Sequence, residues 1–333
     1  MHAPTPRERE PVPPPLRHRK ASFVTTVLEA PPVVGAPAKR RRGKATTHRW
    51  SALFLSPALL IIGVFTIIPM IMTIWISLHQ WSMFTPITEM TWVGLENYSR
   101  LFADPSRVQA IVNTAVYVGL SILITIPLAL LVALLLYFPR LKGKGVVRVI
   151  LFATYVIPTI AIVIIWGNIY ASNYGPLSAM LRTIGLPAPG WLSDPKWALF
   201  SLVIFNVWQM LGYYVILLIA GLTQIPEDLY EAARIDGAGF VRQTLWITVP
   251  MLRPSLVFVV LMTFVNSIQV FDPIYLLTQG GPANSTNVVG FEIQRTAFQY
   301  GMAGESSALA VSLFLMIVAV GGVLGIVMKG RRR

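Results

Sequence analysis

The chain has 333 residues, of which 55% are hydrophobic and only 12% are charged, and its mean hydropathy is +0.64. Soluble domains carry about 25% charged residues, so the composition excludes an ordinary soluble enzyme, and its apolar content excludes a disordered chain. The net charge of +13 indicates nucleic acid or a membrane surface as partner, and the lack of cysteine excludes disulfides, thiolate catalysis and cysteine-ligated metal.

Residues 1–50 differ in composition from the rest of the chain. They hold nine of the 25 prolines and eleven of the 27 Lys and Arg residues. Such a segment buries too little apolar surface to offset its chain entropy, so it is expected to be a disordered, basic, proline-rich tail. It is too long and proline-rich for the start of a signal peptide, so the apolar run that follows is expected to remain as a membrane anchor.

From residue 51 to residue 333 the sequence predicts an all-α membrane domain. A helix needs roughly 20 apolar residues to cross a bilayer, and six nearly uncharged stretches reach that length. None of them has the polar face that a helix in a soluble protein needs. The predicted spans are 51–78, 108–137, 146–170, 197–222, 254–278 and 306–328.

The basic residues between the spans predict the orientation. Alternate segments, starting with the tail, hold 22 Lys and Arg residues, whereas the other segments hold five. By the positive-inside rule the first set is cytoplasmic, so both termini are expected in the cytoplasm of a multi-pass protein of the bacterial cell membrane. The positive charge is then a signal of topology and lipid contact. No nucleic-acid partner is expected, because no aromatic residues interleave the basic run 39–44.

Sequence patterns for catalysis are absent. The chain contains no GxxxxGK[ST] phosphate loop, no HExxH zinc motif and no GxSxG nucleophile motif. We therefore expect a non-catalytic subunit with no cofactor and no metal. If the protein performs energised work, another chain supplies the energy.

The loop at about 223–253 has the pattern of a helix–turn–helix. Pro226 suits the first position of a helix, Glu227 and Asp228 suit the positive end of its dipole, and Gly237 suits a left-handed residue after its end. A second short helix over 239–249 is expected to lead into the fifth span. On the residues alone, this hairpin either packs on its own bundle or docks a cytoplasmic partner.

The same loop resembles a known signature. Glu231-Ala232-Ala233, then Gly237, then Ile247-x-Val249-Pro250 resembles the EAA motif of the membrane subunits of binding-protein-dependent ABC importers, although the family usually has Leu where Val249 stands. The segments 92–98 (WVGLENY) and 277–282 (LTQGGP) resemble the carbohydrate-uptake branch, in the first of the two paired permeases of the maltose and glycerol-phosphate type. The resemblance implies a type I importer permease fold with a cytoplasmic coupling-helix hairpin.

In this family the EAA hairpin docks into a groove on a cytoplasmic ATPase. The resemblance therefore implies a heterodimer with a second permease, two copies of an ABC ATPase, an extracytoplasmic solute-binding protein and a carbohydrate-type substrate. The residues that it assigns to ATPase coupling are Glu231, Ala232, Ala233, Asp236, Gly237, Ile247 and Pro250.

Polar residues within the spans are candidates for a substrate pathway, because they are costly in lipid. Asn206, Gln209 and Tyr213 share one helical face. Alignment on the EAA and TxGGP motifs of the maltose-type subunit places sugar-contacting positions at these three residues and at Ser267 and Gln269. The alternative for each residue is a hydrogen bond between helices.

Asp272 allows a competing hypothesis. It is expected near the outer end of the fifth span, as a structural ion pair or as a substrate contact. A proton-coupled secondary transporter would use it as a relay, but that hypothesis leaves the EAA pattern unexplained. A membrane-embedded enzyme would require paired carboxylates or His at the membrane face, and a purely structural membrane subunit is the remaining alternative.

Overall fold

The computed structural model describes residues 46–137 and 142–330. The expected disordered tail therefore lies mostly outside the described residues. Its last five residues are helical, because α1 (Thr46–Ile62) begins before the predicted span. Residues up to Pro57 and residues from Ala58 onward form two units, and the features below belong to the second.

The first candidate span ends in a small hairpin. After the π-helical turn η1 (Gly63–Ile67), α2 (Ile68–Ser77) packs against α15 (Ala303–Gly330). The strand β1 (His79–Gln80) then pairs antiparallel with β2 (Thr91–Trp92), and His79 lies opposite Trp92. The 3-10 turn η2 (Ile87–Glu89) lies in the connection between the strands.

The centre of the bundle is formed by two long helices that pack along each other. They are α4 (Pro105–Tyr137), which follows the short helix α3 (Glu96–Ala103), and α8 (Pro195–Leu222). Asp194 starts α8, because its side chain accepts a hydrogen bond from the Lys196 backbone N–H at 2.9 Å. Apolar residues of both helices form a buried core, among them Ala133 and Leu134 of α4 and Leu218 of α8.

The predicted third span is found as two helices. α5 (Lys144–Val156) and α6 (Thr159–Ile169) meet at an angle of 101°. Pro158 causes the break, because it donates no hydrogen bond and forces the residue before it out of the helical conformation. Ile157 accordingly has φ −69° and ψ 134°. The short helix α7 (Pro176–Thr183) follows before α8.

The loop after α8 contains the expected hairpin. Its first helix is α9 (Glu227–Ile235), so Pro226 is the residue before the helix and not its first residue. The second half consists of α10 (Phe240–Gln243), the π-helical turn η3 (Thr244–Thr248) and α11 (Val249–Met251).

The fifth candidate span is interrupted near its end. α12 (Arg253–Ile268) is followed by α13 (Asp272–Leu277), and Pro273 at the start of α13 suits the beginning of a new helix. A loop then leads to α14 (Val289–Gln294), the π-helical turn η4 (Arg295–Gln299) and α15.

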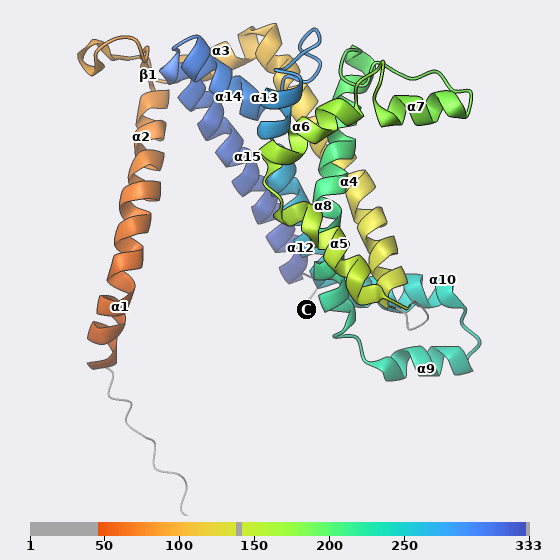
Figure 1. Cartoon of the computed structure of the whole chain (residues 1–333). Helices are drawn as coiled ribbons and strands as arrows, with labels where there is room; N and C mark the ends of the chain where they lie inside the picture. The colour runs from red at the N-terminus through yellow and green to blue at the C-terminus, as the bar shows by residue number, and fades with distance from the viewer. Residues whose placement is uncertain (1–45, 138–141, 331–333) are drawn as a thin grey trace, which may run out of the picture. The chain divides into compact units, whose positions relative to one another are not determined.

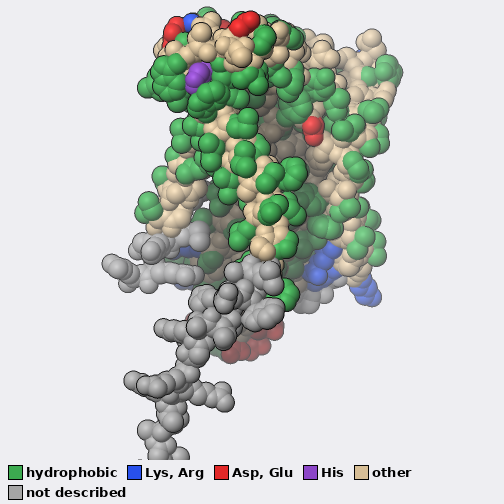
Figure 2. Space-filling view, turned by 90° about the vertical axis from the view of Figure 1, so that its left-hand side faces the viewer, with side chains coloured by type: hydrophobic (Ala, Val, Ile, Leu, Met, Phe, Trp, Pro, Cys, Tyr) green, Lys and Arg blue, Asp and Glu red, His purple; other side chains and the backbone are tan. Residues whose placement is uncertain are grey.

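Within the described residues, five helical segments are long and apolar enough to cross a membrane, or six if α5 and α6 count as one span. Figure 1 shows the two ends of the bundle: β1, α3, α7 and α14 lie at one end, and α9 and α10 lie at the other. Figure 2 shows hydrophobic side chains along most of the visible face and most of its charged side chains near the two ends. This distribution suits a protein surrounded by lipid.

Candidate functional site

The first helix of the hairpin presents the EAA residues to the outside. The side chains of Glu231, Ala232 and Asp236 are exposed, and Ala233 is half-buried. Gly237 follows the helix with φ +74°, a left-handed conformation that costs glycine little. Its backbone N–H donates to the Arg234 carbonyl oxygen at 3.1 Å and closes the turn.

The second half of the hairpin is bonded to the first. The Tyr230 and Thr248 hydroxyl oxygens lie 3.0 Å apart in a buried contact, and Gln243 Nε2 donates to the Ala238 carbonyl oxygen at 2.6 Å. Ile247 packs on the core cluster to which residues 129–136 of α4 and 214–222 of α8 contribute. Pro250 is half-buried in α11. The predicted coupling residues therefore lie in one hydrogen-bonded hairpin, with an exposed first helix and a second half that packs on the bundle.

The predicted pathway residues of α8 lie beside the break between α5 and α6. Gln209 is buried, and its Nε2 donates to the Thr159 hydroxyl at 2.9 Å. Tyr213 stacks on Tyr155, with ring centroids 4.6 Å apart and planes inclined by 16°. Asn206 lies about one turn from Gln209 and is buried. The proline break thus brings an amide, a hydroxyl and two aromatic rings into one place.

Tyr155 and Thr159 were missed in the sequence. Pro158 lies inside the predicted third span and could have shown that this segment breaks, which would have drawn attention to the polar residues beside it. Because residues 146–170 are otherwise mostly apolar, they were predicted to form one unbroken span. An aromatic face and amide or hydroxyl groups are the pairing that suits a sugar ring and its hydroxyls.

The pathway residues predicted in the fifth span are not joined to Gln209 by any described hydrogen bond. Ser267 is fully buried, and within the described residues its hydroxyl has no hydrogen-bond partner. Gln269 is exposed at the end of α12. The link between α8 and α12 runs instead through Asn266, whose Nδ2 donates to the Tyr214 hydroxyl at 3.2 Å.

Asp272 is exposed and begins α13. Among the described residues it forms no ion pair. The described residues therefore do not contain the expected structural ion pair. A carboxylate at the first turn of a helix faces the positive end of the helix dipole, which lowers the cost of keeping its charge.

A group of ion pairs lies at the end of the bundle opposite α9 and α10. Glu305 of α15 pairs with Arg107 of α4 and with Arg100 of α3, the latter at 3.3 Å. The carboxylates of Glu96 and Glu305 raise the pKa of the Arg100 guanidinium. These ion pairs tie α3, α4 and α15 together at the end that the sequence predicts to be outside.

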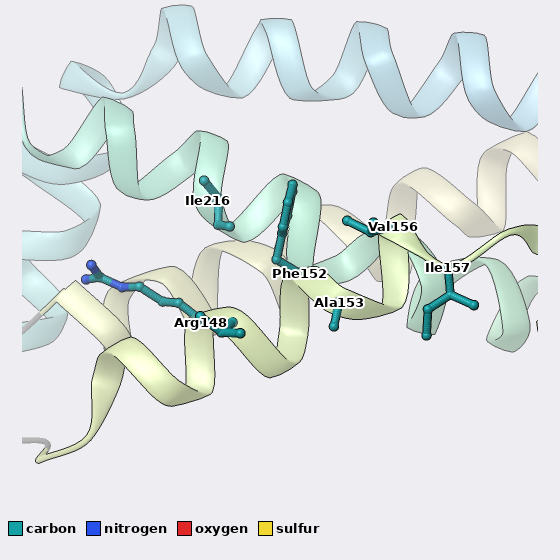
Figure 3. Close-up of a pocket in the computed structure, with 7 residues that line it drawn as sticks. Arg148, Phe152, Ala153, Val156, Ile157 and Ile216 are labelled. Atoms are coloured by element: carbon teal, nitrogen blue, oxygen red, sulfur yellow. The ribbon is translucent and has the colours of Figure 1, made fainter.

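An apolar pocket of about 430 Å³ runs along α5 (Figure 3). None of the predicted pathway residues lines it. Its lining offers a single charged group and no hydroxyl or amide side chain, so it does not suit a sugar. The lining residues are Arg148, Val149, Phe152, Ala153, Val156, Ile157 and Ile216.

Comparison with known families decides the class of protein. Residues 125–332 match the family described as "Binding-protein-dependent transport system inner membrane component". The chain belongs to this family. It is therefore an integral membrane protein of the ABC transporter permease class, a non-catalytic membrane subunit. The matched residues include the α5–α6 break, the hairpin and the whole of α8.

Individual relatives agree with the family. The trehalose/maltose transport system permease protein MalF of Thermococcus litoralis is 36% identical over 270 residues, covering 80% of this chain and 89% of MalF. The lactose transport system permease protein LacF of Rhizobium radiobacter is 31% identical, covering 80% of this chain and 90% of LacF. A probable ABC transporter permease protein of Bacillus subtilis, YurN, is 36% identical, covering 80% and 92%.

The fold is also that of a solved transporter. A chain of the bacterial alginate ABC transporter, solved in complex with its alginate pentasaccharide-bound periplasmic protein, superimposes with a TM-score of 0.71. The sequence identity is 22%, and the match covers 84% of this chain and 93% of that chain. The arrangement of helices is thus that of an ABC transporter membrane subunit.

Proposed function

We propose that this chain is the substrate-translocating membrane subunit of an ATP-driven importer for a sugar or a sugar-like compound such as a glycerol phosphate. It would form the pathway with a second permease in the bacterial cell membrane, with both termini in the cytoplasm. Two copies of an ABC ATPase and a solute-binding protein complete the complex. The names of the relatives MalF and LacF, a trehalose/maltose and a lactose permease, support a sugar as substrate.

The observation that supports a coupling role is that helix α9 is exposed. The exposed residues Glu231 and Ala232 lie in this helix and Asp236 directly follows it, and the contact between Tyr230 and Thr248 holds the helix in place. Small alanines permit close approach of a partner, and a rigid attachment transmits the movement of that partner to α8 and α12. ATP binding would bias a two-state equilibrium between pathway conformations.

The observation that supports a sugar pathway is the polar and aromatic group at the break between α5 and α6. A change of the angle between α5 and α6 would open or close a site beside Gln209 and Tyr213 within the membrane. The amide of Gln209 and the ring of Tyr213 would contact hydroxyls and sugar faces respectively. Asn206, Ser267 and Gln269 remain proposed pathway residues on the strength of the resemblance.

The decisive experiment is purification of the tagged chain from its native membrane, followed by transport assays on what accompanies it. An ATPase, a second permease and a binding protein should co-purify. In liposomes, the complete complex should accumulate a sugar only with ATP, and a panel of sugars and glycerol phosphates identifies the substrate. A purified chain that transports alone under a proton gradient would overturn the proposal and favour the relay at Asp272.

A matched variant tests the hairpin itself. Glu231→Lys reverses a charge on the exposed face of α9 and should abolish uptake while membrane insertion stays normal. Glu89→Lys reverses a charge in η2 at the opposite end of the bundle and should leave the ATPase coupling intact. Normal ATP-driven uptake by the Glu231→Lys complex would contradict the coupling role.

A further inference from the structure

The second half of the hairpin exposes a row of large apolar side chains. Trp246 is 77% exposed, Val241 is 67% exposed and Leu245 is 58% exposed. Gln243 and Thr248 point the other way and are buried. The segment from α10 to η3 therefore has an inner face that packs on its own bundle and an outer face, defined by Val241, Leu245 and Trp246, that the described part of the chain leaves exposed.

The two halves of the hairpin carry opposite charge. The α9 half, residues 226–238, has four acidic residues against Arg234, whereas Arg242 and Arg253 are the charged residues between Gly239 and Phe271. Both arginines are exposed. An anionic surface would attract the second half and repel the first. The acidic residues of the first half are Glu227, Asp228, Glu231 and Asp236.

The position of the second half suits the edge of a membrane. In Figure 1, α10 lies at the level of the ends of α4 and α5, whereas α9 lies beyond those ends. The apolar outer face of the segment therefore lies at the same level as the ends of helices that belong to candidate membrane spans. Amphipathic rings such as that of Trp246 favour the headgroup depth, and cytoplasmic leaflets carry anionic lipids that attract Arg and Lys.

We propose that the segment from α10 to Arg253, the first residue of α12, lies in the headgroup layer of the inner leaflet and binds anionic phospholipid. Val241, Leu245 and Trp246 enter the acyl boundary, and Arg242 and Arg253 hold lipid phosphates. Through the Tyr230–Thr248 contact, this lipid anchor sets the distance of α9 from the membrane. The link to transport rests on the proposed function, because it requires α9 to be the coupling element.

Lipid contact is tested by fluorescence quenching in the full complex, reconstituted in nanodiscs. Phospholipid brominated near the glycerol end of its acyl chains quenches tryptophans at that depth. The signal of Trp246 is the difference between the wild type and Trp246→Phe. As a matched control, Ile235→Trp in the Trp246→Phe background places a tryptophan on α9, where the native side chain is 87% exposed.

We expect the brominated lipid to quench Trp246 and to leave the tryptophan at position 235 unquenched. The aqueous quencher acrylamide should reach position 235 in the complex without ATPase and lose access when the ATPase is added. A Trp246 that brominated lipid does not quench would overturn the proposal. Shielding of Trp246 by the ATPase would then assign this face to protein contact.

The functional consequence is tested by ATP-driven uptake at increasing fractions of phosphatidylglycerol in phosphatidylcholine vesicles. Each of Arg242→Gln and Arg253→Gln should raise the anionic fraction needed for half-maximal uptake about fivefold, the weakening expected for one lost basic residue near a charged surface. Arg234→Gln, on the acidic half, should leave that fraction unchanged. Equal lipid dependence in all three variants would overturn the proposal.

The two proposals fail in different ways. If Trp246 is quenched by lipid but no sugar is transported in any vesicle, the lipid contact stands and the importer function fails. If sugar is transported with ATP but Trp246 is not quenched, the importer function stands and the lipid anchor fails.

Discussion

Gly212 of α8 lies directly against the backbone carbonyl of Leu151 on α5. A Cβ placed on Gly212 would approach that carbonyl oxygen to 1.9 Å. Because a backbone group cannot move aside as a side chain does, the closeness of α5 and α8 requires glycine at this position. The contact lies one turn of α5 from Tyr155 and one residue along α8 from Tyr213, so it fixes the two helices where their tyrosines stack.

Gly212→Ala should destabilise the protein by about 1–3 kcal/mol, the usual cost of overpacking, and should lower transport by separating α5 from α8. Thermal unfolding of the purified complex measures the first effect and ATP-driven uptake the second. Gly119→Ala in α4 is the matched control, because a Cβ there meets nothing within 4 Å among the described residues. If both alanine variants unfold at the wild-type temperature, the tight approach at Gly212 does not constrain the helices.

Gln209→Ala removes the hydrogen bond to the Thr159 hydroxyl, and such a bond between helices contributes about 0.6–2 kcal/mol. We expect a small loss of stability and a larger loss of uptake, because the amide is also a proposed sugar contact. The readout that separates these roles is the ranking of competing sugars in uptake. A Gln209→Ala complex with lower stability but the wild-type ranking would limit Gln209 to a structural role.

Tyr155→Phe should keep the stack on Tyr213, whereas Tyr155→Leu should lose it, together with the roughly 0.5–1.5 kcal/mol that aromatic pairs add. If the stack holds the break in position, uptake falls in the leucine variant and stays near normal in the phenylalanine variant. Equal uptake in both variants would show that stacking at this break is not needed for transport.

The helices and their order follow from composition, because a stretch of 20 or more apolar residues has few alternatives to a membrane helix. The turn at Gly237 was also predicted from the sequence, because a glycine directly after a helix is a local signal for a left-handed residue at the helix end. The break at Pro158 was not predicted, because the surrounding residues are as apolar as those of an unbroken span. Pairings such as Gln209 with Thr159 depend on which helices become neighbours, and no local pattern in either helix encodes that.

Substitutions at Gly237 distinguish the effect of backbone conformation from the effect of side-chain size. It has φ +74°, and a Cβ there would meet nothing within 4 Å. Asparagine tolerates the left-handed conformation, whereas a β-branched residue does not. Gly237→Asn should therefore keep much of the ATP-driven uptake and Gly237→Val should lose it, with both chains inserted at normal levels. Uptake that falls equally in both would point to steric exclusion by the partner and not to backbone strain.

Glu305→Gln should destabilise the end of the bundle at which α3, α4 and α15 meet. The Arg107 side chain is only 8% exposed, and Glu305 is its closer partner. The partner that remains, Asp104, is 43% exposed and lies 3.4 Å away, so the buried cation is only partly compensated, at a cost of up to about 3–5 kcal/mol. Thermal unfolding in detergent measures this cost. Glu96→Gln removes the more exposed partner of Arg100 and should change stability by less than about 1 kcal/mol. An equal loss of stability in Glu305→Gln and Glu96→Gln would show that the ion pair of Glu305 with Arg107 contributes no more than an exposed ion pair.

Asp272→Asn distinguishes an ATP-driven importer from a proton-coupled transporter. Asp272 is exposed at the start of α13 and, within the described residues, forms no ion pair, so neutralising it removes no salt bridge found in this chain. The asparagine variant should retain ATP-driven uptake, and neither protein should accumulate substrate under a proton gradient alone. A proton relay requires the carboxyl group, so it predicts proton-driven accumulation that disappears with Asp272→Asn. That second outcome, measured in vesicles without ATPase, would replace the importer assignment.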